Sequence, residues 1–160
     1  MAKAEFGHSE IPSSFVIRPS SFPPVHEFSI ASGLVEKLLD FAEANPDKKI
    51  VEVRVALGEF TQIDEEQLRF CYEAIITRLP IAGSTLAIEI VPGKVACPHC
   101  AYNGPPKYWE GALSGPPVAT LQCPACGQAA EETEGRECAI RSLRCAQVGA
   151  VARPSFPADD

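Results

Sequence analysis

Two short cysteine pairs restrict what this chain can fold into more than any other feature of its sequence. The first is Cys97-Pro98-His99-Cys100 and the second is Cys123-Pro124-Ala125-Cys126. Two residues between the thiols of a pair allow both sulfurs to face one centre, and four thiolates are the closed ligand set of a tetrahedral structural zinc ion. Glycines and prolines between the pairs are typical of a loop that folds back. We therefore expect one zinc ion to be bound by Cys97, Cys100, Cys123 and Cys126.

Disulfide bonds and a redox-active Cys-x-x-Cys pair are the alternatives for these thiols. The amino-terminal part of the chain does not resemble a secretory signal, since its longest apolar run is Phe15-Val16-Ile17. We therefore expect the chain to reside in the reducing cytoplasm, where cysteine pairs more often bind metal or react than form structural bridges. The total of seven cysteines is also odd. A metal site is the favoured interpretation.

Charge and hydropathy exclude two classes of partner. The chain carries 14 basic and 21 acidic residues, a net charge of -7, so it would repel nucleic-acid phosphates. No segment approaches the roughly 20 apolar residues that cross a bilayer, and we find no basic amphipathic helix. We expect a soluble protein that binds neither nucleic acid nor membrane.

Hydrophobic periodicity predicts two helices. Ser29 is a candidate N-cap for the first helix, whose apolar stripe begins at Ile30 and which ends at Asn45-Pro46. The second helix follows Asp64, which stands three residues before Gln67 in a pattern that resembles a capping box. Each helix has one apolar side, so both are expected to cover a sheet.

Alternating apolar residues predict strands over 50–57, 85–91 and 137–145. In the first of these, Val51, Val53, Val55 and Leu57 should share one face, and Glu52 and Arg54 should lie on the other. The last strand is expected to return to the sheet that the first two form. The predicted fold class is α+β, a small mixed sheet with two helices that carries an inserted zinc-ribbon-like domain.

The predicted organisation has four parts. Residues 1–24 are rich in proline and serine and are expected to be a disordered extension, or the product of a start assigned upstream of the true one. An α/β domain covers residues 25–94 plus 134–147, and the zinc-binding domain covers residues 95–133. Residues 148–160 are expected to be a disordered tail.

The chain has three histidines. His8 lies in the extension and His99 lies between two predicted zinc ligands, whereas His26 opens the folded part. A single histidine near a helix start is usually a surface residue. The residues that follow His26 favour a functional role for it.

Several short motifs occur in a characteristic order. They are His26-Glu27-Phe28-Ser29-Ile30-Ala31, Gly58-Glu59, the pattern Leu68, Phe70 and Glu73, the two cysteine pairs, and Gly135-Arg136-Glu137. In these motifs, from Val25 to about Cys145, the chain resembles the HypA family of hydrogenase nickel-incorporation proteins. The resemblance covers roughly three quarters of the chain.

The resemblance implies a nickel metallochaperone, not an enzyme. Such a protein delivers Ni(II) to the large subunit of a [NiFe]-hydrogenase, works with the GTPase HypB and keeps a structural zinc ion; a homodimer is left open. It implies His26 as the nickel ligand with Glu27 and Asp64 in support, and no catalytic residue. Nickel(II) accepts a tetragonal set of nitrogen and oxygen donors, which suits a histidine with neighbouring backbone nitrogens. For Asp64, a plain helix N-cap is equally open.

One departure from the family pattern changes the expected chemistry. Val25 stands where the family has its initiator methionine, whose amine is among the family's nickel ligands. Either translation starts at position 25 on a valine codon, or the extension is genuine and nickel binds through His26 without that amine. Removing a proton from a peptide nitrogen is harder than from an amine, so the second case implies weaker or differently shaped coordination.

Two other functions fit parts of the sequence. A zinc-ribbon adaptor would dock a partner and would need no His26, whereas a redox or electron-transfer protein would hold iron or cycle its thiols. Hydrolysis at zinc is disfavoured, because four thiolates leave no open position for water. We find no nucleophile-base arrangement and no phosphate-binding glycine loop, so we expect no catalysis.

Overall fold

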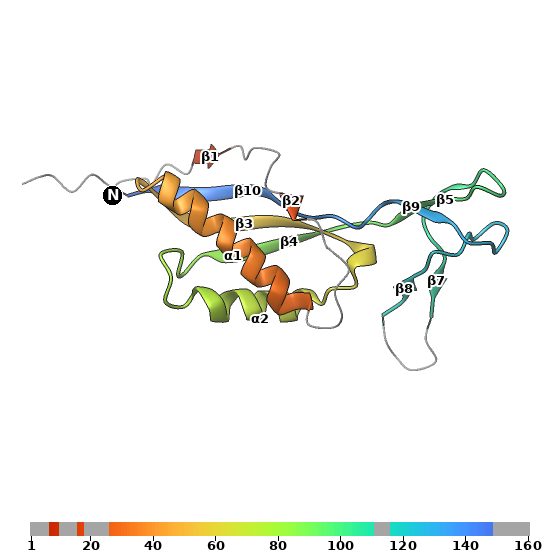
Figure 1. Ribbon diagram of the computed structural model, residues 1–160, viewed down its shortest axis with the longest axis horizontal. Helices are drawn as coiled ribbons and strands as arrows, with labels where there is room; N and C mark the ends of the chain where they lie inside the picture. The colour runs from red at the N-terminus through yellow and green to blue at the C-terminus, as the bar shows by residue number, and fades with distance from the viewer. Residues whose placement is uncertain (1–6, 10–15, 18–25, 111–115, 149–160) are drawn as a thin grey trace, which may run out of the picture.

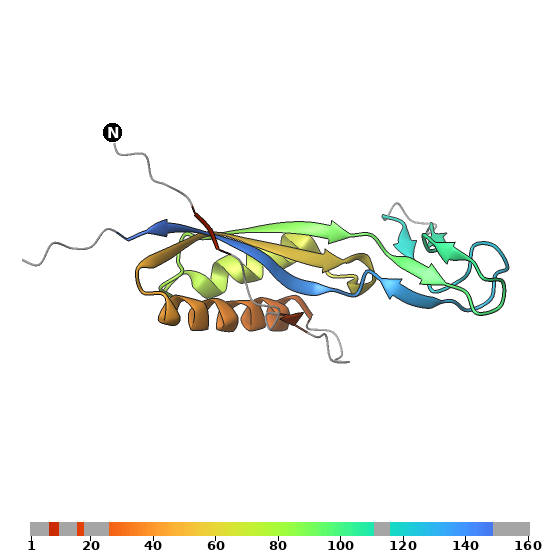
Figure 2. The same cartoon turned by 90° about the horizontal axis from the view of Figure 1, so that it is seen from above.

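The computed structural model describes residues 7–9, 16–17, 26–110 and 116–148, and it has the α+β architecture that the sequence predicts. Two helices, α1 (His26–Ala44) and α2 (Glu65–Ile76), lie on one face of a mixed sheet (Figures 1 and 2). A smaller region with strands of its own extends from one end of that sheet (Figure 1). The molecule is therefore elongated, with an α/β part and a cysteine-containing part.

The main sheet has five strands, and β3 (Lys48–Gly58) is one of its inner strands. β3 pairs in parallel with β4 (Thr85–Val91) and antiparallel with β10 (Cys138–Gln147). Parallel strands need a long crossover, and α2 lies within the one that joins β3 to β4. The last strand returns to the first sheet, which confirms the expectation for residues 137–145.

The cysteine-containing part is built from short antiparallel strands. β5 (Lys94–Ala96) lies between β6 (Asn103–Gly104) and β9 (Glu131–Glu134), and β7 (Tyr108–Trp109) pairs with β8 (Val118–Ala119). Only 92–93 separates β4 from β5, and only 135–137 separates β9 from β10. Two strands of the main sheet thus continue directly into the smaller region.

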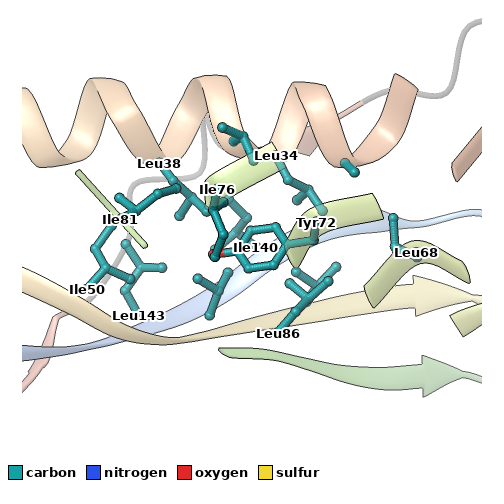
Figure 3. Packing of buried hydrophobic residues seen from close by; sticks show 14 of the residues in the cluster. Leu34, Leu38, Ile50, Leu68, Tyr72, Ile76, Ile81, Leu86, Ile140 and Leu143 are labelled. Carbon is teal, nitrogen blue, oxygen red and sulfur yellow. The ribbon is translucent and has the colours of Figure 1, made fainter. Parts of the chain in front are cut away.

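The core lies between the two helices and the sheet (Figure 3). The helices bury Ala31, Leu34, Val35, Leu38, Leu68, Cys71, Tyr72 and Ile76. Their spacing of three and four residues confirms the predicted apolar stripes, and the free Cys71 thiol packs in this core as a small hydrophobic side chain. Within the described residues, neither helix combines the length and the apolar character needed to cross a bilayer.

The first helix begins one turn earlier than predicted. α1 starts at His26, so Ser29 lies inside the helix and is not its N-cap. Nothing between residues 26 and 29 breaks a helix, and Glu27 in the first turn interacts favourably with the positive end of the helix dipole. The consequence is that His26 and Glu27 are helical residues.

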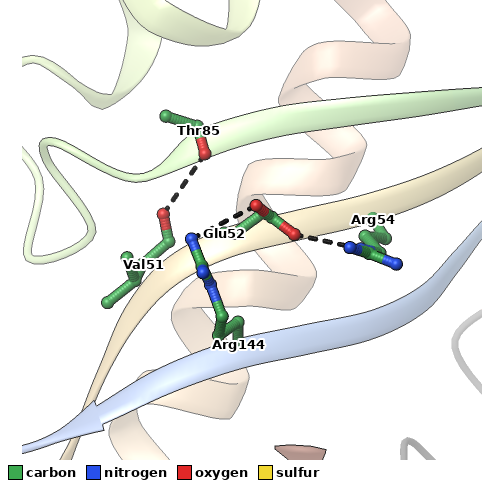
Figure 4. A network of polar contacts seen from close by, with 5 residues as sticks. All are labelled: Val51, Glu52, Arg54, Thr85 and Arg144. Carbon is green, nitrogen blue, oxygen red and sulfur yellow. Dashed lines mark hydrogen bonds and ion pairs between the residues drawn. The ribbon is translucent and has the colours of Figure 1, made fainter. Parts of the chain in front are cut away.

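A one-residue bulge changes which side chains of β3 face the core. Ile50 pairs with Cys145 and Glu52 pairs with Arg144, so Val51 has no partner on β10. Ile50, only 2% exposed, therefore takes the core position expected for Val51, which is half-buried. The Val51 carbonyl accepts a hydrogen bond from Thr85 Oγ1 at 3.4 Å (Figure 4).

On the opposite face of β3, the outward-facing residues behave as predicted. Glu52 pairs with Arg54 at 3.0 Å and with Arg144 at 3.3 Å (Figure 4). Exposed ion pairs of this kind contribute little to stability, typically about 0–1 kcal/mol each. This face is polar, whereas the apolar face is covered by the helices.

Two pieces of the amino-terminal extension are strands, although the sequence analysis expected residues 1–24 to be disordered. β1 (Gly7–Ser9) and β2 (Val16–Ile17) both pair antiparallel with the outer edge of β10. An unpaired strand edge offers free backbone donors and acceptors to any extended segment, regardless of its side chains. The remainder of residues 1–25 lies outside the described residues. Of the predicted tail, 148–160, only Val148 is described, and its N–H donates to the Asp47 carbonyl at 2.8 Å.

Tyr72 gives the core an expected dependence on pH. Its buried hydroxyl donates to Ser84 Oγ at 2.6 Å, because Ser84 itself donates to the Ile81 carbonyl. Burial raises the pKa of Tyr72 above the ordinary 10.0, and the Ser84 bond opposes this only in part. This contribution to stability is therefore fully present below pH 10.0 and is lost as pH rises through the folded-state pKa.

We expect the free energy of unfolding, measured by urea denaturation, to fall as the pH is raised above 10.0. In Tyr72→Phe it should fall less steeply with pH. Tyr102→Phe is the control, since its hydroxyl lies in an exposed contact outside this core. If the free energy of unfolding fell equally steeply with pH in Tyr72→Phe and the parent protein, Tyr72 would not be the source of the pH dependence.

Candidate metal centres

The two cysteine pairs form two loops with the same backbone geometry. The N–H of the first cysteine donates to the carbonyl five residues later, Cys97 to Tyr102 at 2.8 Å and Cys123 to Gln128 at 2.8 Å. The residue after each second cysteine is left-handed, with φ of 58° at Ala101 and 74° at Gly127. The repeated turn is what directs both thiols of a pair to the same side.

The four sulfurs form one cluster instead of two separate pairs. All four lie within 4.8 Å of one another. The shortest distances run between the two loops, 3.6 Å for Cys97 and Cys126 and 3.5 Å for Cys100 and Cys123. These distances far exceed a disulfide bond of about 2.05 Å, and they are close to the S–S separation of about 3.8 Å that a tetrahedral ion with Zn–S bonds of about 2.3 Å requires. The donor set therefore fits a structural zinc ion.

The thiols of this cluster do not titrate alike. Burial acts to raise the pKa of Cys123, but backbone N–H groups of Cys126 and Ala125 and the Cys100 thiol lower it to about 7. For Cys100, a backbone hydrogen bond from Tyr102 lowers the pKa, whereas sharing a proton with Cys123 and burial raise it to about 12. Crowded thiols cannot all ionise, and a dication relieves that repulsion by replacing their protons.

The three cysteines outside the cluster lie in the hydrophobic core of the α/β part. Cys138 and Cys145 face the core from β10, and burial raises the pKa of Cys138 to about 11. Burial likewise raises the pKa of Cys145. Such thiols are poor nucleophiles and poor metal ligands at neutral pH.

The structure brings two of the three proposed nickel residues together. Glu27 lies in the first turn of α1, and its Oε1 accepts a hydrogen bond of 3.4 Å from the Asp64 backbone N–H. Asp64 is the N-cap of α2, because its Oδ1 accepts from the Gln67 N–H at 2.8 Å. His26 is the first residue of α1. The starts of the two helices are thus joined by a carboxylate.

Only half of the predicted capping box is present. In a full box Gln67 would return a side-chain bond to the Asp64 N–H. Here the Glu27 carboxylate takes that donor, and the Gln67 side chain contacts Cys71 Sγ at 3.8 Å. A charged acceptor makes the stronger bond to a backbone N–H, which accounts for the exchange of partners.

A cavity of about 530 Å³ lies between the two parts of the molecule, next to Asp64. One wall comes from the end of β3 and the segment that leads to α2, and includes Glu59, Ile63 and Asp64. The other wall comes from β8 and the residues before it, 116–119. Local sequence patterns do not predict this cavity, because these two segments of its lining are more than fifty residues apart along the chain.

Comparison with known proteins identifies the family. A protein-family model described as "Hydrogenase/urease nickel incorporation, metallochaperone, hypA" matches residues 25–145. The chain belongs to the HypA family. The resemblance inferred from the motifs is confirmed, and so is the α+β fold class predicted from the helix and strand patterns.

Individual HypA proteins support this assignment. The hydrogenase maturation factor HypA of Methanopyrus kandleri is 33% identical over 133 residues, covering 75% of this chain and 92% of that protein. HypA of Methanocella arvoryzae is 32% identical over 119 residues, covering 74% and 96%. A solution structure of HypA protein matches with a TM-score of 0.51 at 25% identity, covering 74% of this chain and 94% of that one. The Helicobacter pylori nickel metallochaperone HypA has the same fold, with a TM-score of 0.50 at 24% identity.

The geometry of the sulfur cluster predicts a specific loss on substitution. We expect Cys100→Ser to lose zinc, with a decrease in affinity greater than the roughly 10- to 100-fold that follows loss of an outer-shell partner. Zinc per chain and the thiolate absorption of the cobalt-substituted protein are the measurements. Cys71→Ala, which changes a buried core thiol, should keep its zinc. One tightly bound zinc per chain in Cys100→Ser would contradict the four-cysteine site.

Proposed function

We propose that this HypA protein binds Ni(II) at the joined starts of α1 and α2, through His26 with support from Glu27 and Asp64. It delivers the ion to the large subunit of a [NiFe]-hydrogenase, working in the cytoplasm with the GTPase HypB, while the four cysteines hold a structural zinc ion. The observation that supports the proposal is the 3.4 Å hydrogen bond from the Asp64 backbone N–H to Glu27 Oε1, which joins the start of α2 to the residue that follows His26 in α1.

The start of a helix supplies suitable nitrogen donors. The first four backbone N–H groups of an α-helix have no partner within the helix, so those of His26 and Glu27 are available to lose a proton to a metal. Backbone and imidazole nitrogens favour a tetragonal Ni(II) site. The helix dipole places a partial positive charge there, which by itself opposes a cation. The carboxylates of Glu27 and Asp64 offset that charge.

An exposed site also suits a carrier. The contact of the Glu27 carboxylate with the Asp64 backbone N–H lies at the surface, so this carboxylate can exchange partners without unfolding the core. The zinc ligands are different, because two of them, Cys97 and Cys123, are buried. One ion is retained by four thiolates, and the other is held where ligands can be replaced one at a time.

The first test separates nickel carriage from a zinc-ribbon adaptor. We expect His26→Ala to lose specific nickel binding and to keep its zinc, because the imidazole is the strongest nickel donor at this helix start and lies on a different element from the cysteines. Equilibrium dialysis followed by metal analysis measures both ions. His8→Ala is the matched control and should bind nickel like the parent chain. Retained nickel in His26→Ala would favour the adaptor.

The second test concerns the residues before Val25. We expect a chain that begins at Val25 to bind nickel more tightly than the full chain, because a free amine with a pKa of about 7.7–8.0 releases its proton far more readily than a peptide nitrogen. Competition against a chelator of known affinity measures the difference. The same shortened chain with an acetylated amine is the control. Equal nickel affinity in all three forms would remove the amine from the site.

A further inference from the structure

Two chain segments cross between the α/β part and the cysteine-containing part, one at Gly93 and one at Gly135, and Gly58 at the end of β3 lies against this crossing. A Cβ built on Gly58 would lie 2.2 Å from the carbonyl carbon of Gly135, and one on Gly135 would lie 2.7 Å from the Cα of Gly93. Side chains are therefore excluded at this crossing. Gly135 also has a φ of 103°, which residues with a side chain rarely adopt. The backbones are in direct contact, so the two parts cannot slide independently.

Phe60 fills the space beside this crossing. It lies in the 3-10 helix η2 (Glu59–Thr61), which directly follows β3. Its backbone N–H donates to the Gly135 carbonyl at 2.7 Å, and its ring packs against the small core around Val95 and Cys123. A residue of the α/β part is thus anchored in the core that surrounds two of the zinc ligands.

Glu59 makes a second connection between the two parts. Its Oε2 accepts a hydrogen bond from the Gly93 N–H at 2.7 Å and another from the Tyr108 hydroxyl at 3.2 Å. Tyr108 lies in β7 and pairs with Ala119 of β8, which lines the cavity next to Asp64. Burial, followed by the neighbouring Glu59 charge, raises the pKa of Tyr108, so its hydroxyl keeps the proton that it donates.

The segment from Glu59 to Asp64 connects this contact to the nickel residues. Gln62 turns back with a φ of 54°, and its N–H donates to the Glu59 carbonyl at 3.4 Å. Asp64 follows two residues later and is held by Glu27. A short, hydrogen-bonded turn therefore joins Glu59 and Phe60 to the start of α2.

We propose that Glu59 and Tyr108 form a latch that fixes the β7–β8 strand pair against the α/β part, and that both act as positioning residues for Asp64 at the nickel site. The latch sets the wall of the cavity beside Asp64 and limits how far the carboxylates can move away from a bound ion. This role rests on the proposed nickel function, although the latch itself is a structural contact that can be tested without nickel.

The test compares two tyrosines of the same region. Tyr108→Phe removes the hydroxyl that reaches Glu59, whereas Tyr102→Phe removes a hydroxyl that donates to the Pro105 carbonyl within the cysteine-containing part. Both keep their rings, so folding and zinc content should be preserved in both. Backbone amide NMR shifts of Gly93, Gln62 and Asp64 report the latch in the zinc-loaded protein without nickel. Nickel dissociation into excess chelator, measured by stopped flow, reports the positioning role.

We expect Tyr108→Phe to shift the Gly93, Gln62 and Asp64 amides and to speed nickel dissociation about two- to tenfold, the range that loss of one hydrogen bond implies. Tyr102→Phe should change neither. Unshifted amides in Tyr108→Phe would overturn the latch. Shifted amides with an unchanged nickel dissociation rate would overturn the positioning role. If the parent protein itself bound no nickel, the proposed function would be overturned instead.

Discussion

The backbone contact at Gly58, Gly93 and Gly135 is the constraint on which the arrangement of the rest depends. Two segments pass between the two parts of the molecule beside the end of β3, and the three backbones lie so close together that a side chain on Gly58 or Gly135 would collide with main-chain atoms. The Phe60 ring closes the remaining space and joins the small core. The crossing fixes where β3 ends, and Glu59, which follows directly, contacts both Gly93 of the crossing and Tyr108 of β7.

The cysteine-containing part is too small to be stabilised by burial alone. Its core holds Val95, Cys97, Cys123 and Ala130, with Phe60 and Tyr102 packed against it. Domains with so little buried surface usually need a metal or disulfides. The free energy of zinc binding to four thiolates is folding free energy for such a unit. Zinc therefore shapes the part that, through Phe60, meets the end of β3.

Much of the fold could be predicted from the sequence, because it depends on local patterns. Apolar periodicity located both helices, and the spacing within each cysteine pair fixed the sulfur cluster. Apart from the start of α1, the errors arose where a partner from elsewhere in the chain decides the outcome. The bulge at Val51 depends on the register with β10, and the bond from the Asp64 N–H goes to Glu27 instead of nearby Gln67. The Glu59–Tyr108 contact left no local signal, since 49 residues separate the two.

The pairing of β1 and β2 with β10 gives the residues before Val25 a physical consequence beyond the question of the amine. β10 pairs with β3 on its inner side, and among the described residues only these two short strands occupy its outer side. A chain that lacked them would display a row of unsatisfied backbone groups along its longest antiparallel ladder. Such a rim attracts extended polypeptide of any sequence, including the same rim of another molecule. By covering this edge, the two strands of the extension would prevent self-association through β10.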